Sequence, residues 1–368
     1  MSTITSTPNH PTMSTCSAIL QKDSPTEQQG NEAGEEYMHP ITVAIEQSGF
    51  TELRYLNSLR TLGQESAVME RHYERQQHTA DGADHTMTRS WFLRMKQIMQ
   101  EIDRFCPVCG IMSGDFRFLD LGCCPGGFSS YILDKNTQAS GFGISLSPQE
   151  GGHPFLMDES LLNRYSIVFA NIARFELGPS SDPELLPTPA RTFDLVVMDA
   201  SHLRNQPQRA AHKVYISELI LGLRAVKMGG SIVLKLHRPE SDYSARLLYL
   251  LDKVSWRIKT FKPMSIHKDR GSFYVIVRGV GLDVHHRPSF ERQALLSRAV
   301  ESFQMLWVDL GEEGRERDLV PEDLNFIITV DDLVKEYTDR LGWLGRKVWE
   351  IQARALVALF RREGIAVD

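Results

Sequence analysis

Residues 120–129, DLGCCPGGFS, bring two kinds of chemistry together in one short stretch. Cys123 and Cys124 are potential ligands of a metal ion or partners in redox chemistry, whereas the glycines suit a turn whose backbone lies against a ligand. Adjacent cysteines cannot easily direct both sulfur atoms to one tetrahedral metal ion, and buried cysteines serve as small packing residues. Glycine has no Cβ atom, so backbone N–H groups can approach a ligand closely, and a following helix N-terminus favours anionic groups. The stretch therefore predicts a ligand-binding turn rather than a sulfur site.

A second sulfur pattern, FCPVCG at 105–110, places Cys106 and Cys109 at the spacing of half a zinc site. A complete structural zinc site has four ligands, and the nearest histidines lie upstream at no recognised spacing. We therefore expect a plain loop and no bound metal, with zinc as the alternative. The five cysteines of the chain are odd in number and unevenly spaced, which disfavours a secreted disulfide framework and indicates a reducing compartment.

The composition is that of a globular protein, because 42% of the 368 residues are hydrophobic and 24% are charged. No run approaches the roughly 18 to 20 apolar residues of a membrane span, and the first residues lack the pattern of a signal peptide. We therefore expect a cytoplasmic or nuclear protein with no membrane partner.

The net charge of −6 disfavours a uniformly basic coat for nucleic acid, but the charge is uneven. Residues 253–270 carry six Lys and Arg against the single acid Asp269, and residues 309–332 carry nine acids against two arginines. With Trp256 and Phe261 interleaved, the basic strip at 253–270 suits an RNA backbone and a stacked base. The alternative is that both segments are solvated faces without a partner.

The chain divides into four parts by composition and periodicity. Residues 1–38 are polar and are expected to be disordered, and residues 39–87 show helical spacing of apolar residues. Short β-prone runs alternate with helix-length segments over 88–284, and amphipathic helices follow over 285–368. This alternation predicts an α/β domain with a doubly wound, mostly parallel, seven-stranded sheet and helical extensions at both ends.

The seven β-prone runs are 116–121, 140–146, 166–170, 193–199, 231–236, 256–261 and 272–279. In an open parallel sheet, ligands bind beyond the carboxyl ends of the strands, and DLGCCPGGFS lies where the first strand passes into its helix. Asp199 and Lys235 end apolar runs, where a charged residue is unfavourable without a purpose. The alternative is that Asp199 caps a helix and Lys235 extends to solvent.

These motifs together carry a resemblance to a known family. DLGCCPGGFS, followed by GFGISL (141–146), VVMDAS (196–201) and GGSIVLKLH (229–237), resembles the FtsJ-like family of S-adenosylmethionine-dependent RNA ribose 2′-O-methyltransferases, nearest its cap-methylating branch. The resemblance covers roughly residues 88–280 and implies a Rossmann-like methyltransferase fold with S-adenosylmethionine as cofactor.

The resemblance also implies catalytic residues, since the family uses a Lys–Asp–Lys–Glu set. Asp199 matches the aspartate and Lys235 matches the central lysine, which acts as general base. For the first lysine we favour Lys96 over Arg94, and the two point to nearly opposite sides of their helix. The expected glutamate falls on Ser272, which leaves a Lys–Asp–Lys triad.

The resemblance also implies which residues bind the cofactor. Ser145 and Asn171 stand where acids usually meet the cofactor ribose and adenine, and the carbonyl of Asn171 can accept the same hydrogen bond. The residues matched to cofactor binding are Asp120, Gly122, Pro125, Gly126, Gly127, Phe128, Ser145, Asn171 and Asp199.

The resemblance thus favours methylation of an RNA ribose. Two alternatives stay open: a methyltransferase of the same fold acting on a small molecule, and a noncatalytic relative that binds RNA or a protein partner. The C-terminal helices are the expected surface for such a protein partner.

Overall fold

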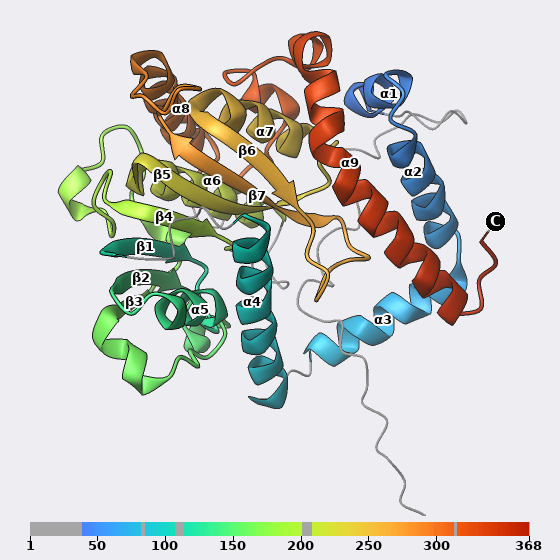
Figure 1. The fold of residues 1–368 in the computed structure, drawn as a ribbon, viewed down its shortest axis with the longest axis horizontal. Helices are drawn as coiled ribbons and strands as arrows, with labels where there is room; N and C mark the ends of the chain where they lie inside the picture. Colours follow the sequence, from blue (N-terminus) through green and yellow to red (C-terminus); the bar gives the residue numbers. More distant parts are fainter. Residues whose placement is uncertain (1–38, 82–84, 107–113, 201–207, 313–314, 368) are drawn as a thin grey trace, which may run out of the picture.

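The computed structural model describes residues 39–81, 85–106, 114–200, 208–312 and 315–367. A sheet of seven strands forms its centre (Figure 1). The strands are β1 (Phe116–Leu121), β2 (Ala139–Ser145), β3 (Tyr165–Phe169), β4 (Phe193–Met198), β5 (Val226–His237), β6 (Ser255–Phe261) and β7 (Ser272–Val280).

The strand order is β3-β2-β1-β4-β5-β7-β6, and the first five strands pair in parallel. Strand β7 runs antiparallel to both of its neighbours. The predicted seven-stranded, mostly parallel sheet is therefore confirmed. Strand β5 is longer than predicted and begins at Val226 rather than at position 231.

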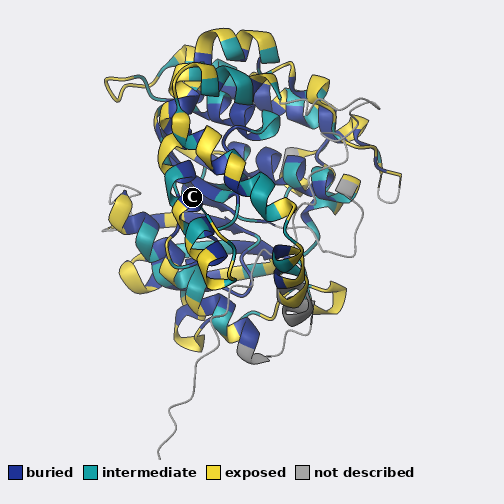
Figure 2. Cartoon of the chain, turned by 90° about the vertical axis from the view of Figure 1, so that its right-hand side faces the viewer, coloured by how far each residue is buried: buried dark blue, intermediate teal, exposed yellow. Residues whose placement is uncertain are grey.

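Helices cover both faces of the sheet because residues of each strand alternate between the two faces. In β1 and β4, Phe118 and Val197 pack toward α4 (His85–Phe105) and α5 (Gly127–Lys135). Their neighbours Leu119 and Val196 pack toward the opposite face with α6 (Gln208–Ala225) and α7 (Asp242–Val254). Buried residues, dark blue in Figure 2, run through the middle of the molecule.

Both helical extensions pack onto this domain. Residues 39–87 were expected to be helical, and the structure forms three helices between Pro40 and Asp81. The elements of the extensions are α1 (Pro40–Gln47), α2 (Thr51–Gln64), α3 (Ala67–Asp81), α8 (Phe290–Asp309), the short helix η6 (Pro321–Leu324) and α9 (Val330–Arg362).

Helix α9 contacts α1, α2, α7 and β6, and it runs diagonally beside α2 (Figure 1). Its apolar stripe, which includes Leu341, Val348 and Trp349, is buried against these elements. The apolar face of α9 is thus covered by the chain itself, and a protein partner for the C-terminal helices stays a prediction.

Several expectations concern residues outside this description. Residues 1–38, which were expected to be disordered, and Cys109 of the possible half zinc site lie outside the described residues. Cys106 is described and is buried. Across the described ranges, no three His, Cys, Asp or Glu side chains form a group that could hold a metal ion. None of the helices in the same ranges is long and apolar enough to cross a membrane.

Helix α5 begins directly against the backbone of α4. A Cβ atom at Gly127 would overlap Phe92 O and would lie 2.6 Å from Met95 Cβ and 2.7 Å from Lys96 N. The structure shows that this glycine allows close approach of a helix, while close approach of a ligand at the same turn stays a prediction. The α4–α5 contact therefore requires glycine at this position.

Gly127→Ala should destabilise the fold by about 1 to 3 kcal/mol, because the added methyl group overpacks a contact formed by backbone. Chemical unfolding without any ligand measures this loss. A matched control is Gly63→Ala in α2, where the nearest atom is a Phe360 ring carbon at 3.1 Å and alanine favours the helix. Equal unfolding curves for Gly127→Ala and wild type would contradict the requirement.

Candidate active site

Three parallel strands run in register and bring the predicted site residues together, although β5 continues to His237. Leu121 of β1 pairs with Met198 of β4, and Met198 pairs with Leu234 of β5. The next residues along each strand are Gly122, Asp199 and Lys235, so the glycine turn, the carboxylate and the amine lie side by side at the carboxyl edge of the sheet.

Asp199 and Lys235 form an ion pair. Lys235 Nζ contacts Asp199 Oδ1, and the Tyr274 hydroxyl donates to Asp199 Oδ2 at 3.0 Å. Tyr274 lies directly across from Lys235 in the antiparallel β5–β7 pair, so both side chains leave the sheet on one face. The side chains of Lys235 and Asp199 are only 16% and 9% exposed, which shields the pair from most water.

The glycine turn is held tightly against the end of β4. Gly122 has φ 78°, and a Cβ atom there would lie 2.6 Å from Ala200 Cα. Asp199 N–H donates to Leu121 O at 3.2 Å. The positive φ of Gly122 and its close contact with Ala200 both exclude a side chain at position 122. The glycine turn is therefore packed directly against the backbone at Asp199 and Ala200.

The rest of the turn is closed by β2 and by the segment that follows β2. Cys123 and Cys124 are buried, and burial raises the pKa of the Cys123 thiol. The Cys124 N–H donates to Ser145 Oγ at 3.4 Å, and the Leu156 N–H donates to Pro125 O at 3.0 Å. Ser145 thus stabilises the turn from the end of β2, and both cysteines serve as packing residues there.

Gly126 supplies the N-terminal cap of α5 with φ 105°. The first backbone N–H groups of a helix have no acceptor within the helix. Glycine has no side-chain oxygen that could accept a hydrogen bond from them. Phe128, the second residue of this helix, is fully buried, and its ring packs edge-to-face with that of Tyr274 at 6.2 Å between ring centroids. The turn therefore ends in a helix N-terminus that can receive an anionic group.

Asp120 lies beneath the turn and is fully buried. Ser129 Oγ donates to its Oδ2 at 2.5 Å, while Oδ1 has no hydrogen-bond partner among the residues that the structure describes. Burial raises the pKa of this carboxyl to about 7 against an ordinary value of 3.8, although the Ser129 hydrogen bonds oppose the shift. Asp120 is thus a buried acid with one unused acceptor atom.

Asn171 lies after β3. Its Oδ1 accepts the Ala173 N–H at 3.0 Å and caps the short helix η4 (Ile172–Arg174). A carbonyl oxygen has two lone pairs, so one acceptor position remains for a ligand donor.

Lys96 and Arg94 diverge on α4. Lys96 Nζ pairs with Asp134 Oδ2 of α5 at 2.5 Å, and the structure does not bring it to the Asp199–Lys235 pair. Burial, the charge of Lys235 and, more weakly, that of Arg94 lower the pKa of His267 in the β6–β7 loop, so the charge of Arg94 acts on this loop. Ser272 has its backbone O bound by Lys262 Nζ at 2.6 Å.

Two residues of this region were not found from the sequence. Glu218 of α6 is buried, and its Oε1 accepts the Ala200 N–H at 2.7 Å, directly after Asp199. Burial raises the pKa of Glu218 to about 8. The sequence feature that could have indicated Glu218 is a single acidic residue within the apolar run ISELILGL at 216–223. No local pattern in the sequence indicated Tyr274 or its bond to Asp199.

Asp120→Asn should change how stability depends on pH. Because the pKa of about 7 lies above the ordinary value, the protonated carboxyl contributes fully below about pH 4, and this contribution is lost as the pH rises through 7. Asparagine does not titrate. The free energy of unfolding of wild type minus that of the variant should therefore fall over this range, by at most about 1.4 kcal/mol per pH unit.

Urea unfolding at several pH values, without ligand, measures this difference. The control is Asp134→Asn, since that carboxylate is 46% exposed on the same helix as Ser129. A wild-type minus Asp120→Asn difference that stays constant with pH would contradict a raised pKa.

Relatives named as RNA-modifying enzymes match about half of this chain. The cap-specific mRNA (nucleoside-2′-O-)-methyltransferase 1 of Bos taurus is 26% identical over 187 residues, 45% of this chain and 22% of that protein. The ribosomal RNA large subunit methyltransferase E of Methanothermobacter thermautotrophicus is 30% identical over 191 residues, 50% of this chain and 80% of that protein. The chain thus spans about a fifth of the cap-specific relative.

Among solved structures, a Plasmodium falciparum protein described as a ribosomal RNA methyltransferase matches with a TM-score of 0.38 and 17% identity, over 51% of this chain and 97% of that chain. A model of the FtsJ-like methyltransferases matches residues 91–280. This match covers about half of the 368 residues and confirms the resemblance seen in the sequence, so the chain belongs to the FtsJ-like methyltransferase family.

Proposed function

We propose that this chain transfers a methyl group from S-adenosylmethionine to a ribose 2′-hydroxyl of RNA. The observation that carries the proposal is the Asp199–Lys235 ion pair, which lies beside the glycine turn at the carboxyl edge of the sheet. Family membership supports the methyl transfer, and the names of the relatives support RNA as the substrate class.

The residues of the turn fit the cofactor. S-adenosylmethionine supplies an electrophilic methyl group on a sulfonium sulfur. The N-terminus of α5, capped by Gly126, suits a carboxylate, and the unpartnered Asp120 Oδ1 suits a nearby ammonium group. We assign Gly122, Pro125, Gly127 and Phe128 to the shape of the turn, and Ser145 and Asn171 to the ribose and adenine side.

Lys235 is the proposed general base. Its amine would accept the proton of the attacking hydroxyl and hold the oxygen that becomes negative. The ion pair with Asp199 favours the charged ammonium, so the amine must lose its proton before it can act as a base. Asp199 holds Nζ at the reacting edge, and Tyr274 fixes the other carboxylate oxygen, so the amine is oriented before the substrate arrives.

A second cation should help at this centre, and the placement of side chains favours Arg94 over the expected Lys96. Lys96 is already paired with Asp134, whereas the charge of Arg94 acts on His267 in the β6–β7 loop. With Ser272 in place of the glutamate, the proposed set is Arg94, Asp199 and Lys235.

The basic strip at 253–270 would contact RNA through its exposed members. Arg257 and Lys268 are exposed, and the Trp256 ring contacts both the Arg278 guanidinium and the His286 ring. Lys262 does not belong to this surface because its side chain is buried and bound to backbone carbonyls. The proposed location is cytoplasmic or nuclear, in keeping with the free thiols of Cys106, Cys123 and Cys124.

Incubation with labelled S-adenosylmethionine, fractionated cellular RNA and, in parallel, a small-metabolite extract tests the function. Label should enter ribose of RNA, and binding of that RNA should weaken steeply with salt. Label found only in metabolites, together with a flat salt response, would contradict the RNA proposal in favour of a small-molecule methyltransferase.

Lys235→Ala should lower turnover by a factor on the order of 10² or more, with the cofactor dissociation constant nearly unchanged, because the amine acts chiefly in the transition state. Asp199→Ala should damage both quantities, since the carboxylate faces the cofactor as well as Lys235. Turnover assays and calorimetric titration separate the two effects. Full activity of Lys235→Ala would overturn the proposed base.

Arg94→Ala and Lys96→Ala should differ sharply when they are assayed side by side. The helix can present only one of the two side chains to the site, and Lys96 is occupied by an exposed ion pair. We expect lower turnover for Arg94→Ala and nearly wild-type turnover for Lys96→Ala. The opposite ranking would restore Lys96 as the second cation.

A further inference from the structure

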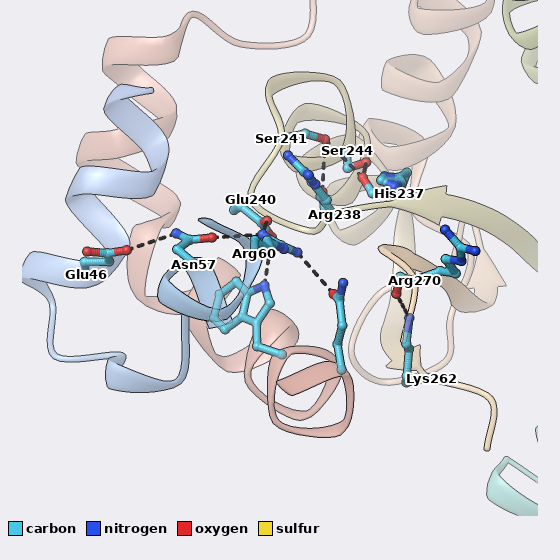
Figure 3. A network of polar contacts seen from close by, with 12 residues as sticks. Glu46, Asn57, Arg60, His237, Arg238, Glu240, Ser241, Ser244, Lys262 and Arg270 are labelled. Carbon is cyan, nitrogen blue, oxygen red and sulfur yellow. Dashed lines mark hydrogen bonds and ion pairs between the residues drawn. The ribbon is translucent and has the colours of Figure 1, made fainter. Parts of the chain in front are cut away.

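A buried carboxylate joins both helical extensions to the catalytic domain. Glu240 lies between β5 and α7 and is 5% exposed. Arg60 of α2 donates from Nη1 to Glu240 Oε1 at 2.6 Å (Figure 3), and Trp349 of α9 donates from Nε1 to Oε2 at 2.7 Å. Each carboxylate oxygen is thus bound by a different extension helix.

The donors are themselves fixed. Arg60 also donates to Asn57 Oδ1 at 2.9 Å (Figure 3) and to Gln352 Oε1 of α9 at 3.1 Å. Burial alone would raise the pKa of Glu240, but the charges of Arg60 and Arg238 and the Arg60 hydrogen bond lower it, so the carboxylate stays ionised. A buried, ionised and fully hydrogen-bonded carboxylate holds a defined geometry.

The turn that carries Glu240 is tied to the last residue of β5. Ser241 Oγ and Ser244 Oγ donate to His237 O at 3.1 and 2.6 Å, contacts that are drawn in Figure 3. Arg238 has the left-handed φ of 47°, and its N–H donates to Gly271 O at 3.0 Å. A shift of Glu240 is therefore transmitted to the carboxyl end of β5.

The neighbouring loop closes against the same turn. Gly271 lies against the His237 ring so closely that a Cβ atom would overlap it. Lys262 Nζ binds the backbone O of Arg270 and of Ser272, the first of which is drawn in Figure 3. The start of β7 is thereby fixed beside His237, two residues beyond Lys235 on β5.

We infer that Arg60, Glu240 and Trp349 are positioning residues for Lys235, so that α2 and α9 hold the catalytic end of β5 in place from outside the family-matched segment 91–280. The inference rests on the proposed function for its kinetic part. On this inference the two helical extensions contribute to catalysis by holding Lys235 in position.

The test compares Glu240→Gln with Glu52→Gln in the full chain. Glu52 of α2 pairs with Arg346 of α9 at 2.7 Å, so the control loosens the same two helices at an exposed site without contact to the β5–α7 turn. Trp349→Phe is a milder second variant, since it removes only the N–H donor and keeps an aromatic ring.

Glu240→Gln and Trp349→Phe should lower turnover by a factor on the order of 10, because small displacements of a catalytic group are costly, while the cofactor dissociation constant stays within about twofold. Hydrogen exchange of residues 236–244 and 262–272 should accelerate in both variants. Glu52→Gln should change neither turnover nor exchange in these segments. All assays are run well below the unfolding temperature of each variant.

Unchanged exchange at 236–244 in both Glu240→Gln and Trp349→Phe would overturn the inference, whatever the enzyme acts on. The inference would also be overturned if Glu52→Gln lost turnover in the same proportion to its loss of stability as Glu240→Gln and Trp349→Phe do. The network would then only stabilise the fold. A wild-type chain that methylates no RNA refutes the proposed function instead, and the exchange comparison still decides whether Glu240 holds the end of β5.

Discussion

Asp199 and Lys235 can pair because β4 and β5 run parallel in a register that places the residue after Met198 beside the residue after Leu234. The register of β1, β4 and β5 sets a glycine, a carboxylate and an amine side by side, and no loop rearrangement is needed to bring them together. A shielded ion pair is stable only when its remaining lone pairs are satisfied. The antiparallel strand β7 meets this requirement through Tyr274, and the backbone next to Asp199 is fixed by Glu218 and by the glycine turn.

The parts of this arrangement that depend on local sequence could be predicted. Apolar runs separated by helix-length segments indicated the seven strands, because buried parallel strands read as continuous hydrophobic stretches. DLGCCPGGFS indicated the turn after β1, and the charged ends of two such runs indicated Asp199 and Lys235. The family match over residues 91–280 adds to what these residues already indicated.

The parts that depend on packing could not be predicted in the same way. The choice between Arg94 and Lys96 turns on the rotation of α4 about its axis, which apolar spacing defines too coarsely. The close contact of Gly127 with α4 also depends on packing that the local sequence does not reveal. The bond between Glu240 and Arg60 spans 180 residues of sequence, and neither residue lies in a recognisable motif.

The same separation bears on the order in which the molecule assembles. Trp349 follows Glu240 by 109 residues, so both hydrogen bonds to this carboxylate close long loops, and contacts of that kind form late in folding. During synthesis all seven strands leave the ribosome before α9 does. A nascent chain can therefore have a complete sheet and glycine turn while one oxygen of Glu240 still lacks its donor. Docking of the C-terminal helix is then the event that finishes the region around β5, and it sets the time at which a newly made molecule acquires its mature geometry.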